Sequence, residues 1–277
     1  MKFINLPSGQ SIPVLGMGTW RMGESSKHHT AEVAALRHGI DFGLTLIDTA
    51  EMYGEGGAEI VVGEAIAHQR SSVFLVSKFY PHNATRQGTI AACERSLKRL
   101  KTDYLDLYLL HWRSSVPLAE TLEALQTLKQ AGKIRDYGVS NFDADDMAEA
   151  MGLPNGQAIA TNQVLYNLTR RGVEWDLLPW CRAHQIPVMA YSPVEQGRLL
   201  GHPTLQTIAQ QHGVSAAQIA IAWLLHQEQV IVIPKSSSIN HVEENLAALD
   251  LQLSLKDLNM LNASFRPPSK RIPLEVL

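Results

Sequence analysis

Cysteine and long apolar runs are both scarce in this chain, and each scarcity excludes a class of protein. Cys93 and Cys181 are the only cysteines among 277 residues, and neither belongs to a CxxC pair or to a Cys/His metal spacing. The sequence therefore excludes a disulfide scaffold and a thiolate metal site, and free thiols within helical patterns are typical of a reducing cytoplasm. No apolar run approaches the roughly 20 residues of a membrane span, and residues 1–7 lack a signal-peptide core. We expect a cytoplasmic protein without a membrane partner.

A surplus of positive charge is also missing. The chain has 24 Lys and Arg against 27 Asp and Glu, a formal net charge of −3. Binding to a polyanion requires a basic surface, so nucleic acid is not an expected partner. Two phosphate-binding signatures are absent as well: no G-x-G-x-x-G opens a first helix, and there is no GxxxxGK[ST]. Without a large basic or apolar stripe, a monomer is the expected state.

The sequence does contain a regular alternation of short apolar strands and amphipathic helices. A hairpin is predicted from residues 3–6 and 11–14, and eight strand–helix units follow it. The predicted strands cover residues 15–20, 45–48, 73–77, 104–110, 134–139, 158–162, 187–190 and 230–233. The predicted helices cover residues 30–42, 57–68, 85–100, 118–130, 143–151, 173–184, 204–226, 240–248 and 254–263. A capping box at Ser215–Gln218 starts the second half of the 204–226 region.

Eight strand–helix units in a chain of this length predict a (β/α)8 TIM barrel, an α/β fold, with two extra helices in its C-terminal half. At 45% hydrophobic residues the chain can bury a large core. No Gly/Ser/Pro-rich linker or block of charge divides it, so residues 1–277 are expected to form one domain. A doubly wound open sheet is the structural alternative, which the missing phosphate-binding motifs disfavour.

Polar or aromatic side chains follow each of the eight predicted strands. They are Trp20, Asp48, Lys78, His111, Ser140 with Asn141, Gln163, Tyr191 with Ser192, and Lys235 with Ser236. In a barrel the carboxyl ends of all strands meet at one rim, so these residues are expected to converge. Taken singly, Lys78 is most simply a solvated lysine and His111 a hydrogen-bonded core histidine. Taken together they predict a functional site.

Three of these positions, together with Tyr53 from the loop after Asp48, carry a family resemblance. Asp48, Tyr53, Lys78 and His111 are similar in type, order and strand position to the catalytic tetrad of the aldo-keto reductases. The flanking segments that agree are residues 46–50 (LIDTA), 104–112 (YLDLYLLHW), 132–135 (GKIR), 138–142 (GVSNF), 233–236 (IPKS) and 244–245 (EN). The resemblance covers the whole chain and includes the hairpin, which in that family caps the barrel bottom. Within the family the chain looks most like bacterial reductases of methylglyoxal and other small aldehydes.

The chemistry of carbonyl reduction gives these residues their expected roles. Negative charge develops on the carbonyl oxygen during reduction, so a proton donor must meet that oxygen. A Tyr hydroxyl with a pKa of about 10 is a weak acid, which a neighbouring Lys cation strengthens. We expect Tyr53 to be the general acid, Lys78 to lower its pKa, Asp48 to anchor Lys78, and His111 to orient or polarise the carbonyl.

The chain has no metal-ligand cluster, so no metal is expected. The resemblance implies a diffusible NADPH (NADP+) cofactor. It implies that Ser140, Asn141 and Gln163 hold the carboxamide and that Tyr191 stacks on the nicotinamide. The full set of implied cofactor contacts is Gly18, Thr19, Trp20, Asp48, Ser140, Asn141, Gln163, Tyr191, Ser192, Pro193, Val194, Gln196, Gly197, Pro234, Lys235, Ser236, His241, Glu244 and Asn245.

Lys235 precedes a predicted helix, and a cation beside a helix N-terminus suits the adenosine 2′-phosphate. His241 stands where many relatives place an Arg. An imidazole offers one donor instead of a bidentate cationic fork, so the preference for NADPH over NADH is expected to be weaker and pH-dependent.

The substrate pocket is expected to be lined by Trp20, Tyr53, Tyr80, His111 and Trp112. The segment after His111 and the tail at 265–277 are both short, which predicts an open site for varied small aldehydes, α-dicarbonyls or α-keto compounds. One alternative is a nicotinamide-binding regulatory subunit of a potassium channel, and another is a sugar or keto-acid reductase with the same chemistry. Turnover separates the first alternative from an enzyme, and a substrate panel separates the second.

Overall fold

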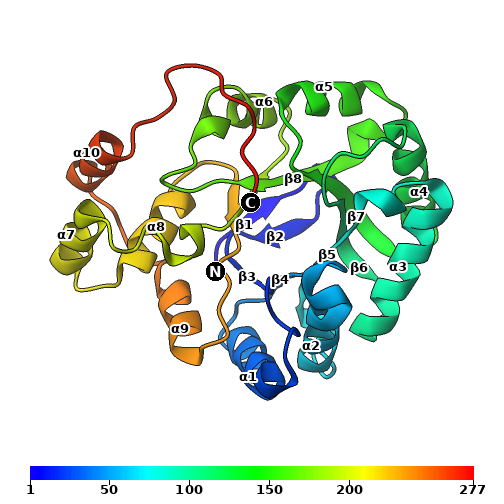
Figure 1. The fold of residues 1–277 in the computed structure, drawn as a ribbon, viewed down its shortest axis with the longest axis horizontal. Helices are drawn as coiled ribbons and strands as arrows, with labels where there is room; N and C mark the ends of the chain where they lie inside the picture. Colours follow the sequence, from blue (N-terminus) through cyan, green and yellow to red (C-terminus); the bar gives the residue numbers. More distant parts are fainter.

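Eight parallel strands form a barrel that the helices surround (Figure 1). The computed structural model describes residues 1–277. The barrel strands are β3 (Gly16–Gly18), β4 (Leu46–Asp48), β5 (Phe74–Phe79), β6 (Leu105–Leu110), β7 (Ile134–Ser140), β8 (Ile159–Leu165), β9 (Val188–Tyr191) and β10 (Val230–Val232). Each strand pairs with the next, and bridges from Leu15 to Val232 and from Gly18 to Lys235 bring β10 against β3. The predicted (β/α)8 barrel is confirmed.

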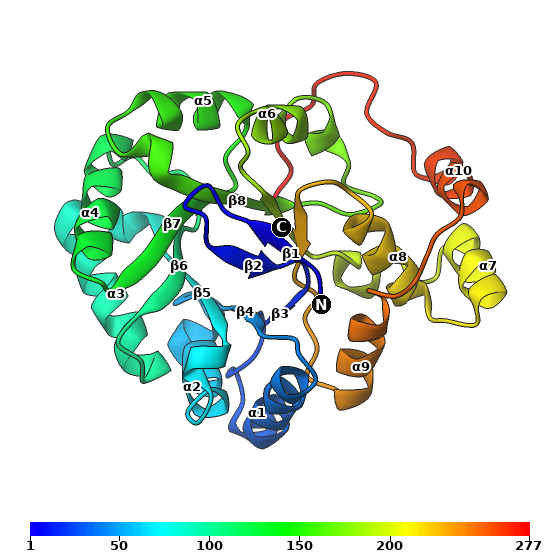
Figure 2. The ribbon, with the colours of Figure 1, turned by 180° about the vertical axis from the view of Figure 1, so that it is seen from behind.

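The helices follow the strands around the outside of the barrel. They are α1 (Ser26–Asp41), α2 (Gly57–Ala65), α3 (Arg86–Leu100), α4 (Leu118–Gln130), α5 (Ala144–Gly152), α6 (Leu177–Ala183), α7 (Pro203–His212), α8 (Ala216–Leu225), α9 (Ile239–Ala247) and α10 (Leu255–Ser264). The two extra helices are α7 and α10, which pack against each other at the edge of the molecule (Figures 1 and 2). None of the helices combines the length and the apolarity that crossing a bilayer requires.

The helical region predicted at 204–226 consists of two helices, and the second begins at the predicted capping box. Gly213 ends α7 in the left-handed conformation, with φ of 67°, which glycine adopts without steric cost. Ser215 then starts α8 as its N-cap. Its hydroxyl accepts from the Gln218 amide, and the Gln218 side chain accepts from the Ser215 amide. The capping box that the sequence contains therefore marks a helix start after a break.

The N-terminal hairpin closes one end of the barrel. Its strands β1 (Phe3–Asn5) and β2 (Ser11–Pro13) lie across the barrel in Figure 2, and the C-terminal tail ends at the opposite face (Figure 1). Leu6 and Ile12 are buried and pack against inward-facing strand residues. The expected cap at the barrel bottom is confirmed, and it leaves the carboxyl ends of the strands as the open end.

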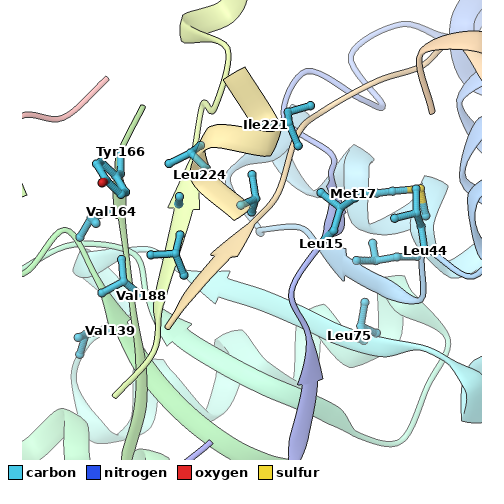
Figure 3. Close-up of a cluster of buried hydrophobic side chains, with 14 of the residues drawn as sticks. Leu15, Met17, Leu44, Leu75, Val139, Val164, Tyr166, Val188, Ile221 and Leu224 are labelled. Atoms are coloured by element: carbon cyan, nitrogen blue, oxygen red, sulfur yellow. The ribbon is translucent and has the colours of Figure 1, made fainter. Parts of the chain in front are cut away.

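Strand residues alternate between two apolar layers. In β6, Leu107 and Leu109 point into the barrel, whereas Tyr108 and Leu110 join the layer between strands and helices. That outer layer, part of which Figure 3 shows, holds 62 buried residues, against 11 in the layer that fills the barrel interior. Because inward side chains fill the barrel, space for a ligand remains only at the rim.

Candidate active site

A buried ion pair lies at the base of the open end. Asp48 is the last residue of β4, and Lys78 lies in β5 with its side chain fully buried. The Lys78 ammonium donates to Asp48 Oδ1 at 2.8 Å, to Asp48 Oδ2 at 2.7 Å and to the Thr49 carbonyl at 2.9 Å. Burial lowers the pKa of Lys78, against the opposing effect of the Asp48 carboxylate. All three donors of Lys78 are used, so the cation is held in one orientation.

Gln163 extends this polar cluster across the barrel from β8. Its Nε2 donates to Asp48 Oδ1 at 2.7 Å and lies 2.9 Å from the Met189 sulfur. The Ser140 hydroxyl donates to the Gln163 carbonyl at 2.8 Å. The Asp48 carboxylate therefore connects side chains from strands on opposite sides of the barrel.

Tyr53 approaches the pair from the loop after β4. The loop first continues the ladder, since the Glu51 amide donates to the Lys78 carbonyl at 3.0 Å, and it then turns into a short 3-10 helix at Tyr53–Gly56. The Glu51 carboxylate fixes the turn by accepting from the Tyr80 amide at 2.8 Å and the Asn83 side chain at 2.7 Å. The Tyr53 ring lies 4.8 Å from Lys78 Nζ, measured to its centroid.

The pKa of Tyr53 is raised in this structure, whereas a lowering through Lys78 was expected. Burial of the ring, followed by the charge of Asp48, raises the pKa of Tyr53 well above its ordinary value. The Tyr53 phenol therefore keeps its proton at neutral pH.

His111 faces Tyr53 from the end of β6. The two rings meet edge to face, with centroids 5.8 Å apart. Burial and then the Lys78 cation lower the pKa of His111 to about 2, so its imidazole is neutral at physiological pH. Its Nδ1 is buried and has no hydrogen-bond partner in the protein. A neutral imidazole supplies one donor and one acceptor without a full charge.

Asn141 connects the ends of β6 and β9. Its Nδ2 donates to the His111 carbonyl at 3.1 Å, and its Oδ1 accepts from the Tyr191 hydroxyl at 3.0 Å. The residue has φ of 58°, a left-handed conformation that Asn tolerates better than most residues. Burial raises the pKa of Tyr191 to about 12, so this bond is made by a neutral phenol.

Most of these side chains line one cavity of about 600 Å³. The lining residues that the sequence predicted are Gly18, Thr19, Trp20, Asp48, Tyr53, His111, Trp112, Ser140, Asn141, Gln163, Tyr191, Ser192, Pro193, Val194, Gln196, Gly197 and Lys235. Predicted residues outside the lining are Lys78, Tyr80, Pro234, Ser236, His241, Glu244 and Asn245. Lining residues that the sequence did not suggest are Arg21, Met52, Ile233 and Leu277.

Comparison with known proteins identifies the family of this chain. A model of the aldo/keto reductase family matches residues 14–265. The chain belongs to the aldo/keto reductase family. Its members are oxidoreductases of carbonyl and alcohol groups.

Individual relatives match along almost the whole chain. Methylglyoxal reductase YeaE of Escherichia coli K12 is 52% identical over 100% of this chain and 99% of its own length. Glyoxal reductase of Bacillus subtilis is 34% identical over 94% of this chain and 91% of its own. A crystal structure of an aldo/keto reductase from Klebsiella pneumoniae in complex with NADP and acetate is 49% identical, covers 100% of this chain and 99% of that one, and superposes with a TM-score of 0.97.

Tyr80 is the member of the predicted substrate pocket that lies outside the lining of this aldo-keto reductase cavity. Its ring packs edge to face against Trp112, with ring centroids 6.2 Å apart, and stacks on His82, with centroids 4.8 Å apart. The sequence predicted that Tyr80 lines the pocket because it follows Lys78, at the end of a strand, by only two positions. Its packing supports Trp112 instead.

The unpredicted lining residues fall into two groups. Arg21, Met52 and Ile233 are sequence neighbours of predicted residues, so proximity along the chain could have suggested them. Leu277 has no local signal, because it reaches the cavity only when the tail folds back over the barrel (Figure 1). The open site stays a prediction, and the short tail contributes its last residue to the cavity wall.

Two cations at the cavity lack a carboxylate partner. The Arg21 guanidinium lies over the Trp20 ring at 4.4 Å, and the Lys235 ammonium only approaches the Ser237 hydroxyl, at 3.4 Å. Burial and the charge of Arg21 lower the pKa of Lys235, while Glu32 and Glu24 oppose them. Two neighbouring cations on one wall of a cavity attract an anion, and phosphate groups are the natural candidates.

Proposed function

We propose that this protein reduces methylglyoxal and other small aldehydes, α-dicarbonyls or ketones to alcohols with NADPH, and that Tyr53 is the proton donor. The proposal is supported by the similarity to methylglyoxal reductase YeaE and to glyoxal reductase over nearly the whole chain. The observation that carries it is the meeting of Tyr53 and His111 with the Asp48–Lys78 pair at one cavity.

The cavity has the groups that a nicotinamide dinucleotide phosphate requires. Ser140, Asn141 and Gln163 offer amide and hydroxyl partners for a carboxamide, and the half-buried Tyr191 offers an aromatic face. Lys235 and Arg21 offer unpaired positive charge for phosphates. A volume of about 600 Å³ lies within the range of ligand-binding cavities. Two crystal structures of aldo-keto reductase from Klebsiella pneumoniae, each 49% identical to this chain, are complexes with NADP or NADPH.

The residues of the site then divide the work. The reduced nicotinamide supplies a hydride. The neutral Tyr53 phenol donates its proton to the carbonyl oxygen as negative charge develops there. The phenolate that remains lies near the fixed Lys78 cation, which stabilises it without reorganisation. The neutral His111 imidazole orients the carbonyl by hydrogen bonding and does not compete as an acid, because its pKa of about 2 keeps it unprotonated.

A direct absorbance assay of NADPH oxidation tests this proposal. The purified protein should turn over methylglyoxal and glyoxal with NADPH, and more slowly with NADH, because NADH has no 2′-phosphate for Lys235 to contact. NADPH binding without turnover of any small carbonyl would contradict the enzyme proposal and favour a regulatory nicotinamide-binding role. Turnover confined to sugars or keto acids would contradict the proposed substrate class alone.

A further inference from the structure

The loop after β9 is built around a buried carboxylate. Glu195 is 4% exposed, and its Oε1 accepts from Arg170 Nε at 3.1 Å, Arg170 Nη2 at 3.0 Å and Arg198 Nη2 at 2.9 Å. Burial opposes its ionisation, but hydrogen bonds from Arg170, Asn167 and Arg198 hold the pKa of Glu195 below its ordinary value. The charge is therefore kept, and it fixes the loop that forms one wall of the cavity.

This loop needs such a restraint because its backbone is strained. Ser192, Glu195 and Gln196 have φ of 50°, 49° and 55°, in the left-handed region that non-glycine residues rarely occupy. Such a conformation is energetically unfavourable and persists only when surrounding contacts impose it. Loss of the contacts to Glu195 would release the loop toward other conformations.

Asn167, after β8, aligns the arginine with the loop. Its Nδ2 donates to the Ser192 carbonyl at 2.9 Å and to Glu195 Oε2 at 2.8 Å. Its Oδ1 accepts from the Thr169 amide at 2.9 Å and the Arg170 amide at 3.1 Å, which closes a turn of the type that Asn favours. The Asn167 side chain thus holds the loop and also fixes the backbone of the turn that carries Arg170.

Arg170 also holds the C-terminal tail. Its remaining nitrogen, Nη1, donates to Glu275 Oε1 at 2.6 Å. The tail runs from α10 over the open end and finishes at the barrel centre (Figure 1), where Leu277 lines the cavity and its backbone lies beside the Tyr191 hydroxyl. One planar guanidinium, with its fixed fork of donors, therefore joins two walls of the cavity.

We propose that Arg170 is a positioning residue that couples the loop at 192–197 to the C-terminal tail, so that cofactor binding and ordering of the tail strengthen each other. This inference rests on the proposed function, in which the loop contacts NADPH. Coupling between two sites is reciprocal, so a change in the tail alters cofactor affinity as much as cofactor alters the tail. Glu275 belongs to the tail and affects the loop only through Arg170.

The tail has a second anchor, which provides a matched control. Arg271 donates to Asp145 at 2.7 Å and pairs with Asp176 at 2.8 Å, and neither residue belongs to the loop. Glu275→Gln and Arg271→Gln therefore each remove one charged attachment of the same tail. Only the first removes the attachment that reaches Glu195.

Isothermal titration with NADPH measures the coupling. Glu275→Gln should raise the NADPH Kd about fivefold, the lower end of typical coupling between sites, while Arg271→Gln changes it less than about twofold. In an Arg170→Gln background, Glu275→Gln should have no further effect on Kd, because the connection is already absent. Hydrogen exchange provides the reciprocal measurement: NADPH should slow amide exchange at residues 272–277 in the wild type and not in Arg170→Gln.

Distinct results separate failure of the coupling from failure of the proposed function. An unchanged Kd in Glu275→Gln, or an equal rise in Arg271→Gln, would overturn the coupling and show that Arg170 merely stabilises the fold. A wild-type protein that binds no NADPH would overturn the proposed function and this inference with it. Thermal unfolding of each variant checks that the native fold is retained, and both tail substitutions are partly exposed, conservative changes.

Discussion

At the scale of single residues, burial decides which groups of the site carry charge. Burial and the Lys78 cation keep the His111 imidazole neutral, and burial together with the charge of Asp48 raises the pKa of Tyr53. Asp48, Tyr53, Lys78 and His111 could be found in the sequence because each follows or ends a predicted strand. Their protonation could not, because it depends on burial and on partners from other strands.

The low pKa of His111 predicts a measurable dependence of stability on pH. The unfolded chain protonates this imidazole near pH 6.5, whereas the folded protein does so only near its pKa of about 2. The unfolded state thus binds more protons, so this part of the stability is complete above about pH 6.5 and is lost as pH falls toward about 2. The loss from His111 is at most about 1.4 kcal/mol per pH unit.

Urea unfolding of the wild type and of His111→Gln between neutral pH and about pH 4.5 isolates this contribution. The free energy of unfolding should fall more steeply with decreasing pH in the wild type than in His111→Gln, because glutamine does not titrate. Parallel curves for the two proteins would show that His111 is not held neutral by the fold.

At the scale of elements, the apolar pattern fixed helices and strands well where caps or glycines mark their ends. Helix α4 spans Leu118–Gln130, as predicted, and Thr85 caps α3 as expected. The strands were predicted to end too early at polar residues. Lys78 pairs opposite Leu109 and Gln163 opposite Met189, so the ladders continue through both. A buried polar residue with a partner does not end a strand, and the sequence does not show the partner.

The start of helix α9 is placed to affect the choice between NADPH and NADH. His241 lies exposed in its first turn, and the Ser238 cap makes no side-chain bond to the helix amides. An arginine there would add a bidentate cation near Lys235 for the 2′-phosphate of NADPH. His241→Arg should lower the NADPH Kd about fivefold, a gain of about 1 kcal/mol for a partly exposed charge pair, and leave the NADH Kd unchanged.

Fluorescence titration with each cofactor measures both constants, and His241→Gln is the matched control that adds no charge. Equal gains for NADPH and NADH in His241→Arg would mean that the side chain does not contact the 2′-phosphate.

At the scale of the whole molecule, barrel closure explains why residues far apart in sequence form one site. Gly18 N donates to the Pro234 carbonyl at 3.0 Å, which brings the first and last units of the barrel together. The eightfold alternation was sufficient to predict this convergence. The position of the tail was not predictable, because it is held by ion pairs between residues far apart in the sequence. Glu275 pairs with Arg170, 105 residues before it, and Arg271 pairs with Asp176, more than 90 residues before it.

The central claim is that this convergence makes Tyr53 the proton donor of carbonyl reduction. Removing Lys78 is a poor test, because it leaves the buried Asp48 carboxylate unpaired, at a cost of about 3–5 kcal/mol in stability. Tyr53→Phe removes only the hydroxyl, which makes no hydrogen bond within the protein, and it keeps the ring beside His111.

The decisive measurement is therefore kcat for methylglyoxal with NADPH in Tyr53→Phe, beside the NADPH Kd of the same preparation. The account predicts that kcat falls by at least about 100-fold, as for loss of a general acid, while Kd changes less than about twofold. A kcat within about threefold of the wild type, with intact NADPH binding, would contradict the account and assign the proton to another group.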